Sequence, residues 1–188
     1  MKLSGLKIKE EYKNNNIYIE KFDEERLNPN SYNLRLHNKL KVYELEDDEF
    51  LDMRKDNKTK DIIIPKEGYV IKPGELYLGR TREFTKTHNL VPGIEGRSSI
   101  ARLGIEVHVS AGFGDNGFEG YWTLEITCVK PVKIYPNEEI CQIFYEPLLG
   151  DSSMKYNGKY QNNNGIQTSQ IFKEIKRRNN KKSILDFN

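Results

Sequence analysis

The segment FEGYWTLEIT, residues 118–127, alternates strictly between two sets of side chains. One set is apolar or small and the other is polar: Phe118, Gly120, Trp122, Leu124 and Ile126 against Glu119, Tyr121, Thr123, Glu125 and Thr127. A period of two residues is typical of a β-strand that turns one face to the core. Glu125 therefore lies on the polar face, where a single glutamate is most often simply solvated.

Outside this segment the chain consists mainly of short β-type runs separated by turn residues. Helical periodicity is confined to residues 3–12, where Ser4 can cap the first turn. Residues 47–61 are almost all charged, and we expect them to form an exposed loop. Runs punctuated by Asn, Gly and Pro cover residues 17–19, 32–36, 40–45, 62–65, 68–71 and 75–81. This pattern predicts an all-β sandwich or barrel with short helices.

Composition limits the kind of protein that this can be. A chain of 188 residues is long enough for one domain with one core. Its 30 Lys and Arg residues nearly balance its 28 Asp and Glu residues, so no overall field favours nucleic acid or a membrane surface. Cys128 and Cys141 form no CxxC pair, and we expect two free thiols. Because the sequence shows neither an apolar signal segment nor a long apolar run, we expect a cytoplasmic protein with no membrane partner.

The run EGRSSIARLG, residues 95–104, has the residue types of an anion site. Ser98 or Ser99 could cap a helix of at most about two turns, and the final glycine stands where a left-handed residue would end it. Ser98 and Arg102 are four residues apart and would share a helix face, while Arg97 precedes free backbone N–H groups. A phosphate placed there would meet amides, hydroxyls and guanidinium groups together. A capped surface helix with solvated arginines accounts for the same residues equally well.

A glycine-rich turn, GFGDNG at residues 112–117, precedes the alternating strand. Its only charged side chain is Asp115. This carboxylate could hold a sugar hydroxyl, or it could form an Asx turn with its own backbone. Local reasoning leaves both interpretations open.

Several segments together resemble the dCTP deaminase branch of the dUTPase-like superfamily. The resemblance rests on EGRSSIARLG at 95–104, VHVSAGFGDNGFEGYWTLEI at 107–126, YPNEEICQIFY at 135–145 and YNGKYQNNNGIQTS at 156–169, with weaker similarity in LSG near the start and NPNSYNLRL at 28–36. These segments follow the family's order, and a combination of motifs is far more specific than any one of them. The resemblance implies a homotrimer of distorted β-barrels, of jelly-roll or β-clip type, with nucleotide sites between neighbouring subunits.

The same resemblance implies how the chain is divided. Residues 1–173 would form a single dCTP deaminase-like domain. Its segment at about 151–173 would be a C-terminal lid that closes over the bound nucleotide. Residues 174–188 would be a basic, disordered tail, although the run KEIKRRNNKKS at 173–183 also permits a nucleic-acid interpretation.

The resemblance assigns nucleotide-binding roles residue by residue. The triphosphate would be bound within one run, by Arg97, Ser98, Ser99, Ile100, Ala101 and Arg102. Asp115 would hold the deoxyribose 3′-hydroxyl, and Phe118 would leave little room for a 2′-hydroxyl. The base would lie along Thr123 and Leu124. Contacts that close over the phosphates would come from Gln142, Tyr156, Lys159 and Asn163.

Catalysis by the resembled family requires one carboxylate to serve as both base and acid. Glu125 would take protons from the attacking water and deliver them first to the cytosine ring and then to the leaving ammonia. Ser98, Arg102 and a backbone carbonyl near Ala111 would assist it. The zinc deaminase signatures H-x-E and P-C-x-x-C are absent from the sequence. His37, His88 and His108 also lack ligand spacing, so we expect a zinc-free reaction in which Mg²⁺ accompanies the triphosphate.

The product is less narrowly specified than the reaction. Our first expectation is deamination of dCTP to dUTP and ammonia. The close alternative is a bifunctional enzyme that releases dUMP, pyrophosphate and ammonia, because AGF at residues 111–113 resembles the members that do so. The turn DNG at 115–117 departs from the usual DPG of the family. A plain dUTPase, or a module that senses a nucleotide without turnover, would retain the same phosphate-binding run.

Overall fold

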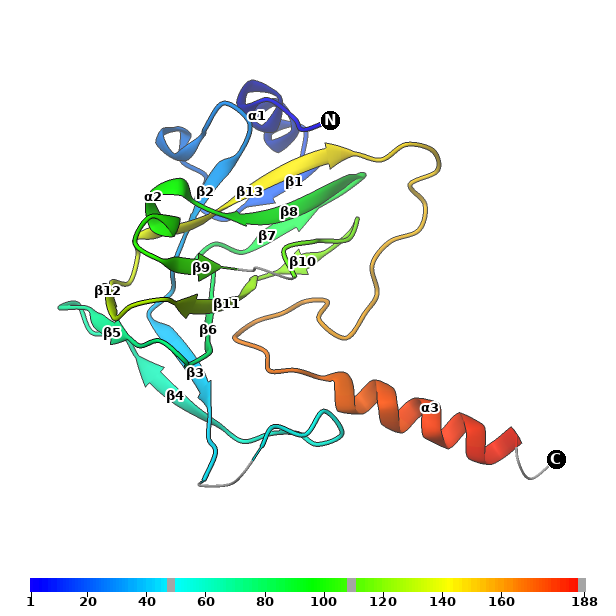
Figure 1. Ribbon diagram of the computed structural model, residues 1–188. Coiled ribbons are helices and arrows are strands. Elements are labelled where there is room, and N and C mark those ends of the chain that lie inside the picture. The colour runs from blue at the N-terminus through cyan, green and yellow to red at the C-terminus, as the bar shows by residue number, and fades with distance from the viewer. Residues whose placement is uncertain (47–49, 108–110, 186–188) are drawn as a thin grey trace.

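The computed structural model describes residues 1–46, 50–107 and 111–185, and short strands make up most of it (Figure 1). The strands are β1 (Ile17–Ile19), β2 (Tyr32–Arg35), β3 (Lys39–Tyr43), β4 (Thr59–Ile63), β5 (Tyr69–Ile71), β6 (Tyr77–Arg80), β7 (Thr85–Thr87), β8 (Leu90–Gly96), β9 (Ile105–Val107), β10 (Glu119–Gly120), β11 (Thr123–Cys128), β12 (Val132–Ile134) and β13 (Glu139–Pro147). The helices are α1 (Gly5–Lys13), the 3₁₀-helix η1 (Glu24–Arg26), α2 (Ser98–Ala101) and α3 (Ile171–Leu185).

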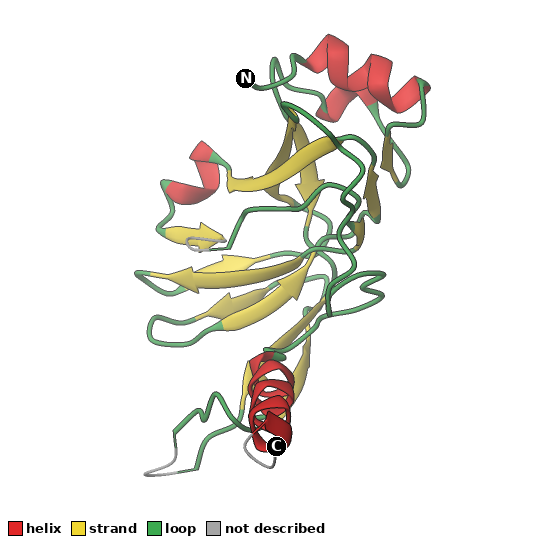
Figure 2. Ribbon diagram, turned by 90° about the vertical axis from the view of Figure 1, so that its right-hand side faces the viewer, coloured by secondary structure: helices red, strands yellow, loops and turns green. Residues whose placement is uncertain are grey.

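Antiparallel pairing groups the strands of the described chain into four sheets. The largest has the order β4-β3-β6-β11-β9, and a second has the order β2-β13-β8. Two smaller sheets have the orders β1-β7-β10 and β12-β5. Strands fill the middle of the molecule, between α1 at one end and α3 at the other (Figure 2). The predicted all-β class with short helices is confirmed, and the distorted barrel does not close into one hydrogen-bonded ring.

Strand β11 shows the alternation that the sequence predicts. Leu124 and Ile126 are completely buried in the core, whereas Thr123 and Glu125 are half-buried on the opposite face. The strand pairs with β6 on one edge and with β9 on the other, and Glu125 lies directly opposite Leu78. Because both edges are paired, the backbone hydrogen bonds fix the register of β11 from two sides.

The predicted single strand at 118–127 is interrupted. Glu119 and Gly120 form β10, which pairs with β7, and the chain then bends before β11 begins. At Gly120 the backbone of Asn163 passes so close that a Cβ atom would lie 2.8 Å from its amide nitrogen. A side chain at position 120 would therefore push the C-terminal segment away from the strand.

Two boundaries test the local predictions. Helix α1 is confirmed, with Ser4 as its N-cap accepting a hydrogen bond from the Lys7 amide at 3.3 Å. The exposed loop expected at residues 47–61 is wrong at its end, because Thr59–Ile63 forms β4 along β3. Strand β4 lies at the edge of its sheet, where charged residues are common, and its Asp61 pairs with Lys41. Residues 47–49 lie outside the described part.

The C-terminal segment leaves the sheets after β13 and ends in helix α3. Residues 151–170, here called the tail, run back across the molecule from the end of β13, and α3 then projects away from the sheets (Figure 1). Lys and Arg favour helix, and Glu174 in the first turn of α3 pairs with Lys159 of the tail. Residues 186–188 lie outside the description. No helix of the described chain has the length and apolarity needed to cross a bilayer.

The two cysteines are part of the core. Cys128 ends β11 and Cys141 lies on β13, and both are buried free thiols. Burial raises the pKa of each thiol above its usual value. They are therefore packing residues rather than reactive ones.

A buried carboxylate joins three separate parts of the chain. Glu83 is 1% exposed and accepts hydrogen bonds from Arg26 Nη1 at 2.6 Å and from Arg35 Nε at 2.7 Å. Its other oxygen accepts from the Arg35 amide at 2.9 Å. Arg26 is itself buried, so removal of the carboxylate would leave its charge without compensation in the interior.

We expect Glu83→Gln to lower the free energy of unfolding by about 3 kcal/mol, because it breaks a buried ion pair from one side only. Urea unfolding followed by circular dichroism, at a matched protein concentration, measures this change. Glu67→Gln is the control, since Glu67 is exposed, and it should change stability by less than about 0.5 kcal/mol. Equal stability of the two variants would contradict the prediction.

Candidate active site

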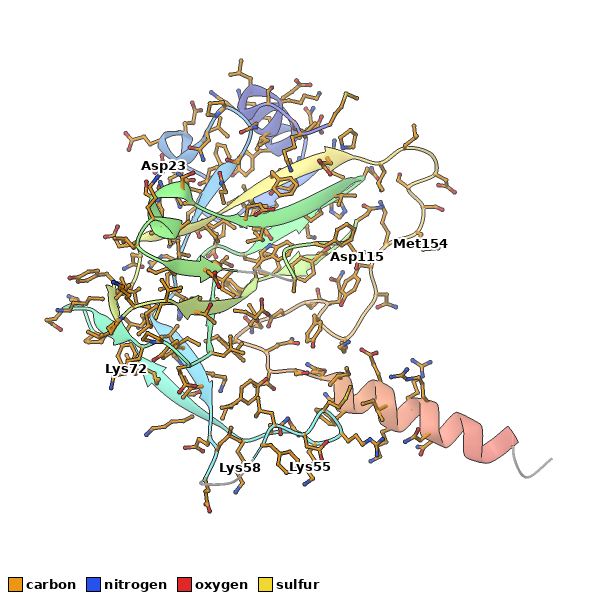
Figure 3. The ribbon with its side chains drawn as sticks, viewed as in Figure 1. Asp23, Lys55, Lys58, Lys72, Asp115 and Met154 are labelled. Carbon is orange, nitrogen blue, oxygen red and sulfur yellow. The ribbon has the colours of Figure 1, made fainter. Side chains whose placement is uncertain are left out.

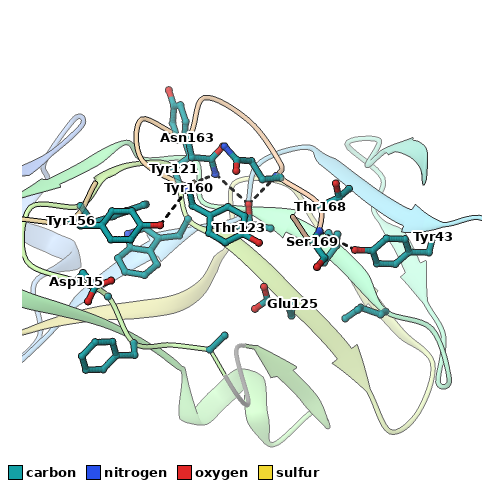
Figure 4. Close-up of a pocket in the computed structure, with 18 residues that line it drawn as sticks. Tyr43, Asp115, Tyr121, Thr123, Glu125, Tyr156, Tyr160, Asn163, Thr168 and Ser169 are labelled. Carbon is teal, nitrogen blue, oxygen red and sulfur yellow. Dashed lines mark hydrogen bonds between the residues drawn. The ribbon is translucent and has the colours of Figure 1, made fainter. Parts of the chain in front are cut away.

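The cavity that contains Glu125, here called the main cavity, has a volume of about 510 Å³. It lies between β11, the turn that precedes β10, and the tail (Figure 4). Polar and aromatic side chains from distant parts of the chain meet in it. Those expected from the sequence are Ala111, Asp115, Phe118, Thr123, Glu125, Tyr156 and Asn163. The cavity thus unites most of the residues assigned to base, sugar and proton transfer.

Glu125 reaches the main cavity because of its place on β11. Leu124 and Ile126 on either side of it enter the core, so the strand's pleat turns the carboxylate to the opposite face. One carboxylate oxygen is buried from solvent. Thr123 shares this face and stands beside the tail. Leu124 cannot line the cavity with its side chain, so any contact with a base from that position would come from its backbone.

The turn before β10 places one carboxylate at the cavity and uses its neighbour as an anchor. Asp115 is exposed and lies near Met154 of the tail (Figure 3). Asn116 is buried, and its side-chain amide donates to the carbonyls of Ser152 and Met154, both at 3.1 Å. Its oxygen accepts from the Asn89 amide at 2.9 Å. Asn116, which stands in the DNG turn where the family usually has the proline of DPG, therefore holds the tail in place.

Aromatic rings pack beside this turn. Phe118 lies 4.8 Å from Trp122 and 6.1 Å from Tyr156, measured between ring centroids. The Trp122 indole N–H donates to Thr85 at 2.9 Å, which fixes the orientation of the stack. Phe118 is consequently held at the wall of the main cavity.

Side chains of the tail attach it to β10 and β11 by hydrogen bonds. The Asn163 amide group donates to the Tyr121 carbonyl at 2.7 Å and to Thr123 Oγ1 at 3.2 Å. Gln161 donates to the Gly117 carbonyl at 2.8 Å and accepts from the Glu119 amide at 3.1 Å. Asn163 thus anchors the tail to the segment that leads into β11.

Three further parts of the main cavity were missed from the sequence. Tyr43, Tyr160 and residues 167–169 all line it. The Ser169 amide donates to the Tyr43 hydroxyl at 3.2 Å, and the Gln167 amide donates to Thr123 Oγ1 at 3.1 Å. Tyr43 lies more than a hundred residues before its partner in the tail, so no local pattern could indicate this contact.

A second cavity, of about 620 Å³, contains part of the predicted phosphate-binding run. Arg97, Ser98 and Ala101 line it, between β8, β9 and β13. The Arg97 guanidinium donates to the Glu139 carbonyl at 3.0 Å and pairs with the Glu139 carboxylate at 2.8 Å. Phe113 lies at the boundary, because it lines both this cavity and the main one.

The short helix in this run differs from its prediction at the start. Arg97 is the N-cap of α2 and makes no side-chain capping bond, so neither Ser98 nor Ser99 caps it. The helix begins one residue earlier than expected and places both serines in its exposed first turn. The left-handed end is confirmed, since Gly104 has a φ of 76°. Ser99 and Arg102 are exposed outside both cavities, and Ile100 packs against the core.

Gln142 and Lys159 lie outside both cavities. Gln142 on β13 donates to the Gly96 carbonyl at 3.0 Å and accepts from the Ser31 hydroxyl at 2.7 Å. This bond network continues through Asn33, which donates to Glu139 at 2.9 Å. The segment NPNSYNLRL thus supports Arg97 indirectly. Lys159 pairs with Glu174, which raises the pKa of the lysine and lowers that of the glutamate.

The described residues contain no group of three or more His, Cys, Asp or Glu side chains placed to hold a metal ion. His37 and His88 do not line the main cavity. His108 lies outside the described residues. The main cavity offers two carboxylates, those of Asp115 and Glu125, together with hydroxyl groups, amides and aromatic rings.

Comparison with known proteins identifies the family of the chain. A family model described as dCTP deaminase-like matches residues 2–148. The "dCTP deaminase, dUMP-forming" of Hathewaya histolytica is 57% identical over 93% of this chain and 99% of its own length. The protein of the same name from Clostridium acetobutylicum is 58% identical over the same shares.

A solved structure shows a related fold. The 2′-deoxycytidine 5′-triphosphate deaminase of Agrobacterium tumefaciens is 18% identical, with a TM-score of 0.60 over 78% of this chain. This chain spans about half of that structure, since the match covers 48% of it. At this identity the likeness supports the fold alone. The matching family model and the extensive identity to its curated relatives show that this chain belongs to the dCTP deaminase-like family.

Proposed function

We propose that this protein hydrolyses dCTP to dUMP, pyrophosphate and ammonia in the cytoplasm. The position of Glu125 carries the proposal, because β11 directs this carboxylate into a cavity that also contains Asp115 and Phe118. Both curated relatives described above bear the name of the dUMP-forming enzyme. They favour the bifunctional alternative over our first expectation, release of dUTP, and AGF at residues 111–113 agrees with them.

Glu125 performs the proton transfers of the deamination. Its carboxylate takes a proton from water as the water oxygen bonds to C4 of the cytosine ring. The carboxyl group gives this proton to N3. The carboxylate then takes the second proton, from the new hydroxyl on C4, and delivers it to the amino group; the C4–N4 bond breaks, the C4 carbonyl forms, and ammonia leaves. Partial burial shields the carboxylate from bulk water and strengthens its interaction with the reacting atoms. Two groups help to orient the water: the Ser98 hydroxyl and a backbone carbonyl near Ala111.

The sugar and base occupy the main cavity. Asp115 at its mouth accepts a hydrogen bond from the deoxyribose 3′-hydroxyl. Phe118, held against Trp122, leaves little room for a 2′-hydroxyl. Thr123 and the backbone of Leu124 lie along the base. A second water molecule then attacks the α-phosphorus, the bond from this phosphorus to the oxygen shared with the β-phosphate breaks, pyrophosphate leaves, and the water proton passes to solvent. Mg²⁺ bound to the triphosphate would neutralise part of the charge on the leaving pyrophosphate.

The triphosphate is bound by a neighbouring subunit. Arg97, Ser98, Ser99 and Arg102 supply guanidinium groups and hydroxyls suited to phosphate oxygens. In one chain these residues lie at a second cavity or on the exposed side of α2, apart from Glu125. A complete site therefore combines the main cavity of one copy with the α2 region of another, as in a homotrimer with sites between its subunits.

Residues 151–173 act as a lid over this site. Much of their attachment consists of hydrogen bonds by Gln161 and Asn163 rather than of a deeply buried apolar face. Each such bond contributes about 1 kcal/mol, so the segment can detach without unfolding the sheets. Tyr156 and Lys159 approach the phosphates when the lid closes, and Gln142 supports the same region from β13.

We expect Glu125→Gln to lower ammonia release from dCTP by about 10³-fold, since the amide cannot accept the water proton. Binding of dCTP, measured by calorimetry, should change by no more than a few-fold. The control is Glu138→Gln, an exposed carboxylate outside both cavities, which should keep the wild-type rate. Substantial ammonia release by the Glu125 variant would eliminate the assigned role.

Product analysis of dCTP turnover distinguishes the candidate activities. We expect dUMP, pyrophosphate and ammonia in equal amounts, without accumulation of dUTP. Accumulation of dUTP would instead identify a simple deaminase. Turnover of dUTP without ammonia release from dCTP would identify a dUTPase, and tight binding without any product would identify a sensor.

Mixing of inactive variants tests whether the site is shared. Glu125→Gln and Arg102→Gln should each be inactive alone. Co-expressed in equal amounts, they should recover about a quarter of the wild-type rate. Half of the chains supply an intact Glu125 and half supply an intact Arg102, so random assembly places both at about one site in four of a heterologous interface. Absence of any recovery in confirmed mixed oligomers would show that both residues act within one chain.

A further inference from the structure

A small pocket of about 180 Å³ lies beside the main cavity and has no part in the proposed reaction. Tyr121 forms part of the wall of both. The walls of the small pocket are unusually rich in basic side chains, which are Lys21, Arg35, His37, Arg80 and Arg82. The feature that requires an explanation is why so many basic groups converge there.

Strand geometry brings these side chains together. Leu36 and Thr81 form an antiparallel bridge just beyond the ends of β2 and β6, and both are buried. Backbone bonds flank the bridge, from the His37 amide to the Arg80 carbonyl at 3.0 Å and from the Arg82 amide to the Arg35 carbonyl at 2.7 Å. Since side chains alternate along a strand, the residues on either side of the bridge share the outer face. They face each other as Arg35 with Arg82 and His37 with Arg80.

Protein carboxylates compensate only part of this charge. Glu83 neutralises Arg35 and also holds Arg26. Among the described residues, no carboxylate forms an ion pair with Arg80, which lies 3.9 Å above the Tyr121 ring and donates to the Thr81 carbonyl. Like charges placed across neighbouring strands destabilise a sheet, so an additional anion would stabilise this face.

Two further cationic groups, Arg82 and Lys21, and one further carboxylate, Glu20, line this pocket. Arg82 donates to the Asn137 side-chain oxygen. Glu20 accepts long hydrogen bonds from the Phe84 amide at 3.3 Å and from the Tyr121 hydroxyl at 3.4 Å. The pocket therefore keeps an excess of positive charge.

His37 provides an independent indication of a missing partner. Its Nδ1 atom is buried and has no hydrogen-bond partner among the described residues. An unsatisfied buried polar atom costs about 1 to 3 kcal/mol. Burial, together with the charges of Arg80, Lys39 and Arg82, lowers the pKa of His37 to about 4. A bound anion would oppose this effect and could accept an N–H bond from the ring.

We propose that this pocket binds a small tetrahedral oxyanion of the phosphate class, held by Arg80, Arg82 and His37. Guanidinium groups match phosphate oxygens in geometry as well as in charge. The volume of about 180 Å³ is small beside that of the main cavity and suits an inorganic ion. Inorganic phosphate and pyrophosphate share this chemistry, and only their size distinguishes them here.

The test uses the full chain with labelled histidines and follows the imidazole resonances by NMR between about pH 4 and 8. His37→Gln assigns the signal, since the chain has only three histidines. Phosphate should raise the apparent pKa of His37 by about 1 unit or more relative to chloride at equal ionic strength. Pyrophosphate is titrated separately, and a response to either oxyanion that chloride does not produce supports the proposal. An equal response to chloride would overturn the proposal.

Matched variants separate this pocket from its surroundings. Arg80→Gln and Arg82→Gln should abolish the response to phosphate, and Arg80→Lys should weaken it if the glutamine variant does not fold. Lys39→Gln is the control, because Lys39 also lowers the pKa of His37 but does not line the pocket. Arg102→Gln should keep the response to phosphate. Loss of the response in this variant would assign phosphate to the nucleotide site and overturn the proposal.

Discussion

One strand has to serve the hydrophobic core and the candidate active site at the same time. In β11, the side chains of Leu124 and Ile126 fill the core while Glu125, between them, enters the main cavity. A shift of one residue in register would bury the carboxylate and expose the leucine. Pairing with β6 and β9 on both edges prevents such a shift. The cavity, the tail that covers it and the turn before it all depend on this register.

The two cavities show a division of chemistry within the chain. The main cavity contains a carboxylate, aromatic rings and hydroxyl groups, whereas the second contains Arg97 and Ser98. Arg97 is positioned by Glu139, which is in turn bound by Asn33 from a distant strand. A site for a charged nucleotide needs both sets of groups, and their separation within one chain is the basis of the proposed site between subunits.

Much of the fold follows from local patterns, and the failures have physical causes. Ser4 and the period of the first helix predict α1 correctly, and the alternation at residues 118–127 predicts the buried face of β11. The end of the loop at 47–61 was wrong, because an edge strand can be highly charged when one side remains in water. The cap of α2 was wrong because capping depends on the backbone conformation of one residue, which composition does not specify. The role of Asn116 was missed because its partners lie in the tail.

The sequence by itself determined the β class, the burial pattern around Glu125 and, through its motifs, the family. These are local properties, since side-chain period and motif order are written along the chain. Only the tertiary structure decided that Asn163 anchors the tail, that Tyr43 joins the cavity wall, and that the predicted phosphate residues lie apart from Glu125. The physical reason is that each depends on contacts between segments far apart in sequence. The meeting of Arg80 with His37 has the same origin, because it requires two strand ends to pair.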